Sequence, residues 1–331
     1  MNLESIYKPI TDDLKKVDSL LASSITESSN QSVLDMSNSL SGLSSGKKLR
    51  PALVILSEKA ASAGNGNGVR KIERLITLAT AVELIHLASL IHDDILDKAT
   101  VRRGQPSVNT VLGDDVSIVF GDYIYSKAFE LIGKCRNPDI FECISQAIYV
   151  MCEGELIQVC QRGNLNLPVD KYIAVVKKKT AKLLATCCHV GAMLGNHGQN
   201  VQTALKEFGM NFGIAFQIID DCRDIVSGEN TLGRKPGQDA LTGDITLPLL
   251  NLLDVARGAK KKKIKTILAS SPDSRDAETI REMFLDSGAM ETTRKTALDY
   301  IGRARSRLKE LESSDYRKSL YGLTDYIAES F

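Results

Sequence analysis

The sequence predicts an all-α protein, and three observations support this fold class. Almost every segment of the 331 residues places apolar side chains at helical spacing rather than in strict alternation. The chain has eight prolines, and most of them stand where these segments begin or end. The sequence contains neither an alternation of strand and helix patterns nor a Gly-rich strand-to-helix turn. We therefore expect a single domain over residues 1–331, folded as one large bundle of roughly ten or more helices.

The helical segments follow one another with short polar connections. We expect helices over residues 3–24, 51–62, about 69–98, 115–133, 138–162, 169–195, 200–226, 245–256, 260–270, 276–286, 289–312 and 314–329. A Ser-rich stretch at 28–45, a Gly/Asn linker at 64–68 and a loop at 99–107 should connect the first of them. The helix ending at Lys98 would span about 45 Å at ~1.5 Å per residue. A helix of this length can line a deep central cavity.

An acidic run at the end of that long helix is the first chemical feature. Asp93, Asp94 and Asp97 follow an apolar helical pattern. With about 3.6 residues per turn, Asp93 and Asp97 share one helix face, whereas Asp94 turns about 100° away. Carboxylates gathered in this way repel one another and favour a bound cation, and hard divalent cations prefer oxygen ligands.

The same spacing recurs in Asp220, Asp221 and Asp224. One acidic helix end is more often solvated than metal-binding. Two such ends, each closing an apolar run and each near Arg or Lys, favour a site for divalent metal ions. Mg²⁺ commonly binds through a few carboxylates together with phosphate oxygens, so we expect a phosphorylated substrate.

Several basic residues could bind that substrate. Arginine suits phosphate because its planar group donates two parallel hydrogen bonds, and Arg102 and Arg103 follow Asp97 closely enough to fold back over bound metal. His86, two turns before Asp93 on the same face, is either a core residue or a phosphate donor. The basic candidates, each a surface charge when taken alone, are Lys47, Arg50, Arg102, Arg103, Lys179, Arg234 and Lys235.

Other classes of function find little support. The formal net charge is +1, Trp is absent and aromatic residues make up 5%, so neither charge nor base stacking indicates a nucleic-acid partner. The GxSxG elbow and the GxxxxGK[ST] loop are both absent, which argues against a serine hydrolase and a P-loop nucleotide site. The run Lys260–Lys263 is more typical of a solvated helix start than of a surface for an anionic membrane.

The compartment is predicted from cysteine usage and from the N-terminus. Seven cysteines form no CxxC pair and no Cys/His metal pattern, so we expect reduced thiols and a cytoplasmic location. The amphipathic, acidic N-terminus is unlike a signal or transit peptide, although an organelle stays open if a transit peptide was removed. We expect no membrane span, because no run of about 18 apolar residues occurs.

A set of motifs gives the chain a family resemblance. The motifs are GKKLRP at 46–51, ELIHLASLIHDDILD at 83–97, RRG at 102–104, KKT at 178–180, FQIIDDCRD at 216–224, LGRKPGQD at 232–239 and GDITLPLL at 243–250. Their order resembles that of trans-isoprenyl diphosphate synthases, which join isopentenyl diphosphate to an allylic diphosphate. The resemblance implies an isoprenoid synthase fold, three Mg²⁺ ions per site and a homodimer.

The resemblance also implies a role for each matching residue. Isopentenyl diphosphate would be held by Lys47, Arg50, His86 and Arg103. Metal would be bound by Asp93 and Asp97 on one wall and by Asp220 on the facing wall, with Asp221 and Asp224 assisting. The allylic diphosphate would be held by Arg102, Lys179, Thr180, Gln217 and a base at Arg234 or Lys235. Catalysis would then depend on Asp93, Asp97, Arg102, Lys179 and Asp220.

Two positions depart from the family pattern. Arg234 stands where the family usually has Lys, and Lys235 follows it. Asp244 stands where the family often has Lys. Either the loss of that cation weakens the allylic diphosphate site modestly, or the position does not matter. Neither change removes a metal ligand.

Product length is predicted from the helix below Asp93. Ala88 and Ser89 lie one turn below it and Ile85 two turns below, so we expect them to line the path of the growing chain. In short-product relatives, the resemblance implies a bulky aromatic residue here. Because Ala88 and Ser89 are small, we expect a product longer than geranylgeranyl diphosphate, although small residues also allow close helix packing. Phe141 or Tyr149 should then form the floor.

Several alternatives stay open. One is a geranylgeranyl or farnesyl diphosphate synthase. A second is a non-catalytic subunit of a heteromeric synthase, which would be expected to have lost acidic residues that are all present here. A third is a terpene cyclase, which would not need Lys47, Arg50 and Arg103 for a second diphosphate. For a homodimer, the segment 115–133 is the candidate interface, although it could equally be core.

Overall fold

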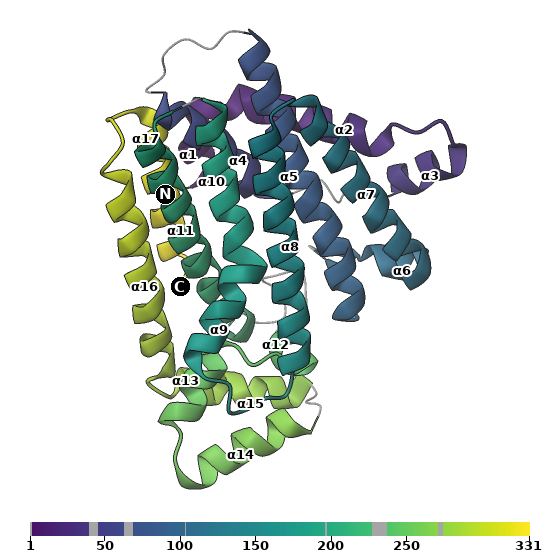
Figure 1. Cartoon of the computed structure of the whole chain (residues 1–331). Helices are drawn as coiled ribbons and strands as arrows, with labels where there is room; N and C mark the ends of the chain where they lie inside the picture. Colours follow the sequence, from purple (N-terminus) through teal and green to yellow (C-terminus); the bar gives the residue numbers. More distant parts are fainter. Residues whose placement is uncertain are drawn as a thin grey trace.

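The structure is a computed structural model that describes residues 2–39, 46–62, 69–102, 104–195, 197–226, 237–270 and 274–331. Long helices run side by side along the molecule, and shorter helices close its lower end in Figure 1. The helices are α1 (Leu3–Tyr7), η1 (Lys8–Ile10), α2 (Thr11–Thr26), α3 (Gln31–Ser39), α4 (Leu49–Ala61), α5 (Val69–Leu96), α6 (Val108–Leu112), α7 (Asp114–Lys134), α8 (Pro138–Gln161), α9 (Val169–Val176), η3 (Lys177–Ala181), α10 (Lys182–Leu194), α11 (Gln199–Val226), α12 (Gln238–Thr242), α13 (Leu247–Val255), α14 (Gly258–Ala269), α15 (Ser274–Leu285), α16 (Ala289–Leu308) and α17 (Asp315–Ala328).

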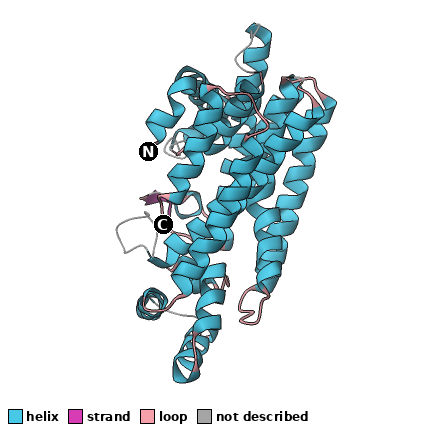
Figure 2. Cartoon of the chain, turned by 90° about the vertical axis from the view of Figure 1, so that its left-hand side faces the viewer, coloured by secondary structure: helices cyan, strands magenta, loops and turns pink. Residues whose placement is uncertain are grey.

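The architecture confirms the predicted all-α fold class. Figure 2 shows helices joined by loops, and among the described residues the only strands form one hairpin, in which β1 (Val101–Arg102) pairs antiparallel with β2 (Gln105–Pro106). The helices share a continuous hydrophobic core, with α10 packed against α4, α8 and α11. The helix α5 packs against α2, α4 and α7, so it is surrounded on most sides.

Two glycines of α11 allow the closest helix approach. A Cβ on Gly209 would lie 2.7 Å from the Cα of Ala185, and one on Gly213 would lie 2.7 Å from the Cα of Ala181. Such distances are far inside van der Waals contact, so larger residues would push α11 away from α10. The close approach sets the separation of the two helices that carry Lys179 and Asp220.

The predicted helix at 169–195 is continuous but irregular. A π-helical turn, η3, separates α9 from α10 at Lys177–Ala181. Gly154 of α8 lies against it, because a Cβ there would lie 2.6 Å from the backbone nitrogen of Lys179. Turns of this type are rare and frequent at functional sites, and this one aims Lys179.

Short elements are the main difference from the predicted helices. The Ser-rich stretch predicted as a connection contains α3, whose start is capped because the Asn30 side chain accepts a hydrogen bond from the backbone of Ser32 at 2.9 Å. The first predicted helix is divided by η1, where Pro9 lacks the backbone N–H that a continuous helix needs. The helices α6 and α12 were not predicted. The linker at 64–68 lies outside the described residues.

Within the part of the chain that the structure describes, one helix meets the length and apolarity of a membrane span. The stretch Lys71–Leu96 of α5 is apolar enough by composition, but 72% of its most apolar window is buried inside the bundle. A buried central helix passes the same test, so this stretch is weak evidence for a span.

Candidate active site

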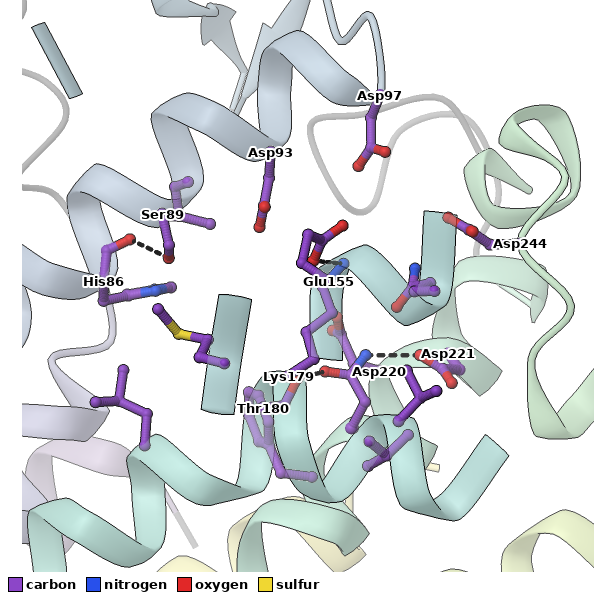
Figure 3. A pocket seen from close by; sticks show the side chains of 18 of the residues that line it. His86, Ser89, Asp93, Asp97, Glu155, Lys179, Thr180, Asp220, Asp221 and Asp244 are labelled. Carbon is purple, nitrogen blue, oxygen red and sulfur yellow. Dashed lines mark hydrogen bonds and ion pairs between the residues drawn. The ribbon is translucent and has the colours of Figure 1, made fainter. Parts of the chain in front are cut away.

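Carboxylates from the two acidic clusters line one cavity. Figure 3 shows the two groups on opposite sides of it. Asp93 and Asp97 come from the C-terminal end of α5, and Asp220 and Asp221 come from α11. The cavity measures about 960 Å³, at the upper end of the ~300–1,000 Å³ typical of ligand pockets. Apolar side chains complete its lining, among them Leu90, Met151, Leu156, Val176, Leu183 and Phe216.

The middle carboxylate of the first cluster holds a cation rather than facing the cavity. Asp94 is buried, and its Oδ1 accepts a hydrogen bond at 2.7 Å from Nε of Arg102 and a second one from Nη2. Arg102 belongs to β1, so the hairpin folds back onto the end of α5. Because Arg102 also lines the cavity, Asp94 fixes this cation at the edge of the site.

Lys179 lies among carboxylates of the cavity. Its Nζ is 2.6 Å from Oε2 of Glu155 on α8. Burial opposes a charge on Lys179, but Asp93 and Glu155 raise its pKa above the ordinary value, so the ammonium stays charged. Burial raises the pKa of Asp93 to about 7, Lys179 opposes the rise and Glu155 adds to it. A further cation would therefore stabilise the ionised form of Asp93.

Asp221 is held by the protein on both of its oxygens. Gln217 donates to Oδ1 at 2.6 Å and the hydroxyl of Tyr172 donates to Oδ2 at 2.5 Å. Thr180 in turn donates to Oε1 of Gln217 at 2.7 Å. Burial raises the pKa of Asp221 to about 7, and these two hydrogen bonds to the carboxylate lower it. The network orients α11, so that Asp220 faces the cavity.

Asp224 lies on α11 as expected, but its side chain is not part of the cavity lining. It is fully buried and is absent from the cavity lining. Its Oδ2 accepts a hydrogen bond at 3.0 Å from the backbone of Asp239, and its carbonyl oxygen accepts one at 2.8 Å from Gly237. Asp224 therefore joins α11 to α12, and its position argues against the expected role of assisting metal ligand.

Most of the predicted phosphate-binding residues do meet in the cavity. The lining contains Lys47, Arg50, His86, Arg102, Lys179, Thr180 and Gln217. The loop that carries Lys47 is held in place, because the Tyr7 hydroxyl donates to its carbonyl oxygen at 2.9 Å and its ammonium lies 5.4 Å from the ring centre of Tyr326. Arg103, Arg234 and Lys235 lie outside the described residues.

The carboxylates fit Mg²⁺ as a metal that arrives with a phosphorylated ligand. Among the described residues, no three His, Cys, Asp or Glu side chains are grouped closely enough to hold a metal alone. Asp93, Asp97 and Asp220 instead offer oxygen atoms from two walls of one cavity. Mg²⁺ keeps several waters and binds through one or two carboxylates plus phosphate oxygens, which matches this open donor set.

Comparison with known proteins agrees with this geometry. The sequence model of the polyprenyl synthetase family matches residues 31–284. The chain belongs to the polyprenyl synthetase family. It is therefore a trans-prenyltransferase. Enzymes of this family use isopentenyl and allylic diphosphates as substrates.

Relatives of this synthetase differ in product length. It is 36% identical over 291 residues to the short chain isoprenyl diphosphate synthase of Methanothermobacter thermautotrophicus, with 86% of each chain covered. It is 28% identical to the octaprenyl diphosphate synthase of Escherichia coli, covering 98% of this chain and 97% of that one. The polyprenyl synthase from Caulobacter crescentus CB15, solved with calcium and isoprenyl diphosphate, superposes with a TM-score of 0.92 at 28% identity, covering 99% of this chain and 97% of that one.

The lining of the synthetase cavity corrects the expected chain-length residues. Ala88 and Ile85 are fully buried and lie outside the lining, whereas Ser89, His86 and Leu90 belong to it. The predicted face was rotated by about one residue, or about 100° of helix turn. The packing of α5 against its neighbours decides which stripe faces the cavity, and spacing from Asp93 alone does not show this.

The predicted floor of the synthetase cavity is also wrong. Phe141 and Tyr149 are 44% and 63% exposed on α8. Neither belongs to the cavity lining. Met151, two residues beyond Tyr149 on α8, is buried and does line the cavity. The prediction that this helix forms a wall of the cavity was therefore correct, but residues other than Phe141 and Tyr149 point inward.

Three residues of the synthetase site were not predicted. Glu155 pairs with Lys179, Tyr172 orients Asp221, and Arg162 at the end of α8 contacts Asp97. Each is a single polar residue in a helical segment, without a repeated pattern to mark it. Gly154 beside Glu155 was the available signal, because a glycine inside a long helix indicates close packing.

Proposed function

We propose that this synthetase joins isopentenyl diphosphate to an allylic diphosphate with Mg²⁺ and makes a polyprenyl diphosphate longer than geranylgeranyl diphosphate. One observation carries the proposal. Carboxylates on two facing walls, with cations between them, line the same cavity as a set of apolar side chains. This combination suits a ligand with an anionic head and an oily tail.

The chain's own residues account for departure of the diphosphate. Lys179 and Arg102 are fixed by Glu155 and Asp94, so they keep their positions when negative charge develops on the leaving group. Preorganised cations of this kind stabilise such charge without reorganisation. Mg²⁺ bound by Asp93, Asp97 and Asp220 would supply further charge neutralisation. Breaking the C–O bond leaves an allylic cation in the apolar part of the cavity, where water is excluded.

The second substrate has a separate set of residues. Lys47, Arg50 and His86 line the cavity from the start of α4 and the middle of α5, away from the η3 turn that carries Lys179. Isopentenyl diphosphate held there would place its double bond beside the cation. Attack forms the new C–C bond, and a proton is then lost, for which the released diphosphate is the nearest base.

A product longer than geranylgeranyl diphosphate is supported by the corrected lining. Ser89 and Leu90 both lie about one turn from Asp93 and line the cavity, and the small side chain of Ser89 leaves the path open on its side. The test is mass analysis of products made by the purified protein from isopentenyl and farnesyl diphosphates with Mg²⁺. Products beyond geranylgeranyl are expected. Geranylgeranyl diphosphate as the longest product would refute the proposed length and favour the alternative suggested by the short-chain relative.

The same assay separates the remaining alternatives. Elongation by the protein alone is expected, and its absence would favour a subunit of a heteromeric synthase. Ring formation from one allylic substrate would favour a cyclase. We propose a cytosol-like location, which is supported by the seven cysteines, all of which are unpaired.

A homodimer is supported by an exposed apolar surface. On α7, Ile118 and Val119 are 46% and 66% exposed, and on α8, Phe141 and Tyr149 are 44% and 63% exposed. Exposed apolar side chains this numerous are typical of an interface. We therefore propose that α7 and α8 form it, and Val119→Glu should convert the dimer to a monomer in light scattering.

Release of product at a membrane surface is supported by α14. Its residues Lys260, Lys262 and Lys263 are exposed, and no ion pair to them is found among the described residues. In Figure 1, α14 lies at the same end of the bundle as α12, whose residue Asp239 belongs to the cavity lining. Binding to vesicles with anionic lipid, but not to neutral vesicles, would support this surface.

A further inference from the structure

Arg162 bridges two loops at the mouth of the cavity. It caps the C-terminal end of α8, and its Nη2 donates to Oδ1 of Asp97 at 2.6 Å. Its Nε donates to Oδ1 of Asp244 at 3.1 Å, and its Nη1 donates to the carbonyl oxygen of Leu96 at 3.3 Å. One guanidinium therefore joins the end of α5 to the loop between α12 and α13.

The bridge is anchored on both sides. The backbone nitrogen of Gly163 donates to the carbonyl oxygen of Gly243 at 2.8 Å, which holds the end of α8 against the α12–α13 loop. The backbone nitrogen of Asp244 donates to the carbonyl oxygen of Asp239 at 2.8 Å, and the Asp239 nitrogen donates to Asp224 of α11 at 3.0 Å. Arg162 is thus fixed relative to both acidic clusters.

The bridge also explains the acidic residue at position 244. Asp244 is 6% exposed, so its charge would be costly without a partner, and Arg162 supplies that partner. The cation expected at position 244 is present at the mouth after all, but it comes from α8. Because Asp97 shares the same guanidinium, the two carboxylates compete for it.

We propose that Arg162 is a positioning residue that occupies Asp97 until a diphosphate enters with its metal. This inference rests on the proposed function. A free divalent cation at Asp97 meets the fixed guanidinium, and two cations on one carboxylate repel each other. A diphosphate reverses this effect, because its negative charge attracts both the metal and Arg162. Arg162 therefore opposes loading of metal alone and favours loading of metal with diphosphate.

Two substitutions should act in opposite directions on free metal. Arg162→Gln removes the competing cation, so Mn²⁺ alone should bind roughly three- to tenfold more tightly. Asp244→Asn removes one of the two carboxylates that bind Arg162, so Arg162 should pair more strongly with Asp97. Mn²⁺ alone should therefore bind more weakly. With inorganic pyrophosphate present, Arg162→Gln should instead weaken Mn²⁺ binding by a similar factor. If Arg162 only stabilised the fold, Arg162→Gln would lower stability, and its effect on Mn²⁺ affinity would not change sign when pyrophosphate is added.

The experiment measures free Mn²⁺ by electron paramagnetic resonance, with and without inorganic pyrophosphate. The control is Arg305→Gln, because Arg305 bridges Thr324 and Asp325 between α16 and α17, outside the cavity lining. Unchanged Mn²⁺ binding in both site variants would overturn the inference while leaving the function intact. Failure of the unaltered protein to bind Mn²⁺ even with pyrophosphate would instead count against the proposed function. If Arg162→Gln does not fold, Asp244→Asn still tests the proposal, and unchanged or tighter binding there would overturn it.

Discussion

The Tyr172 hydroxyl donates a hydrogen bond at 2.5 Å to Oδ2 of Asp221, and both groups are buried. Burial raises the pKa of Tyr172 well above its ordinary value, and the neighbouring carboxylate adds to this, so the hydroxyl keeps its proton. The helix that leads into the π-turn and the second acidic cluster are therefore joined by a donor that does not ionise at working pH.

Tyr172→Phe removes that donor without changing the ring. The Oδ2 atom of Asp221 then stays buried with one partner fewer, which should lower the free energy of unfolding by about 1–3 kcal/mol. The turnover number should fall, because Asp221 no longer orients the end of α11. Urea unfolding and steady-state kinetics check both effects. Unchanged kinetics with lowered stability would mean that the bond only stabilises the fold.

Gly154→Ala tests the placement of Lys179. The new Cβ would lie 2.6 Å from the backbone nitrogen of Lys179, so the π-turn must move. Since misplacement by ~1 Å can cost about 100-fold, the turnover number should fall by at least about tenfold. The matched control is Gly302→Ala, where no atom lies within 4 Å and the variant should be as stable or more so. Wild-type kinetics for Gly154→Ala would show that Lys179 is placed by something else.

Ser89→Phe and Ala88→Phe should behave differently, although the two residues are adjacent. Ser89 lines the cavity, so a phenyl ring there should block the growing chain and shorten the product. Ala88 is fully buried away from the lining, so Phe there should lower stability by about 1–3 kcal/mol through overpacking and leave product length unchanged. Mass analysis of products and thermal unfolding measure these outcomes. A shorter product from Ala88→Phe alone would restore the original prediction.

His189 should make stability depend on pH. Burial, with Lys206 and Lys182 nearby, lowers its pKa in the folded protein. Near pH 6.5 the unfolded chain therefore binds a proton more readily than the folded protein. The contribution of neutral His189 to the free energy of unfolding is present above about pH 6.5 and is lost as the pH falls. Asp93 and Asp221 act in the opposite sense, because their pKa values are raised.

The contribution of His189 is therefore measured by comparing the pH dependence of stability in the wild type and in His189→Gln. The free energy of unfolding should fall less between about pH 7.5 and about pH 5.5 in His189→Gln than in the wild type. Urea unfolding at the two pH values gives this difference. Equal changes in the two proteins would show that His189 does not contribute.

The parts of the site that repeat could be predicted from the sequence. The spacing of Asp93 and Asp97, and its recurrence at Asp220, indicated that the ends of two helices contribute to one site. The helices that carry them were predicted to within a few residues, because their apolar pattern is long and regular. Short elements such as α3, α6 and η3 were missed, because a few residues carry too little periodicity.

The remaining features depend on tertiary packing. Whether Ser89 or Ala88 faces the cavity depends on which helices surround α5, and the sequence of α5 does not contain that information. Glu155 and Arg162 acquire their roles only when the end of α8 lies beside η3 and the α12–α13 loop. Asp224 has the right spacing for a metal ligand, but packing brings its Oδ2 against the backbone nitrogen of Asp239, which spacing along one helix does not show.

The central claim is that carboxylates on both walls act together to release the diphosphate. The direct measurement is the rate of diphosphate release from farnesyl diphosphate in the presence of isopentenyl diphosphate and Mg²⁺. It compares Asp93→Asn and Asp220→Asn with Asp139→Asn, a control on the exposed surface of α8. Each wall variant should lose about 10³-fold in turnover with unchanged circular dichroism, and the control should match the wild type. A wild-type rate in either wall variant would contradict the account.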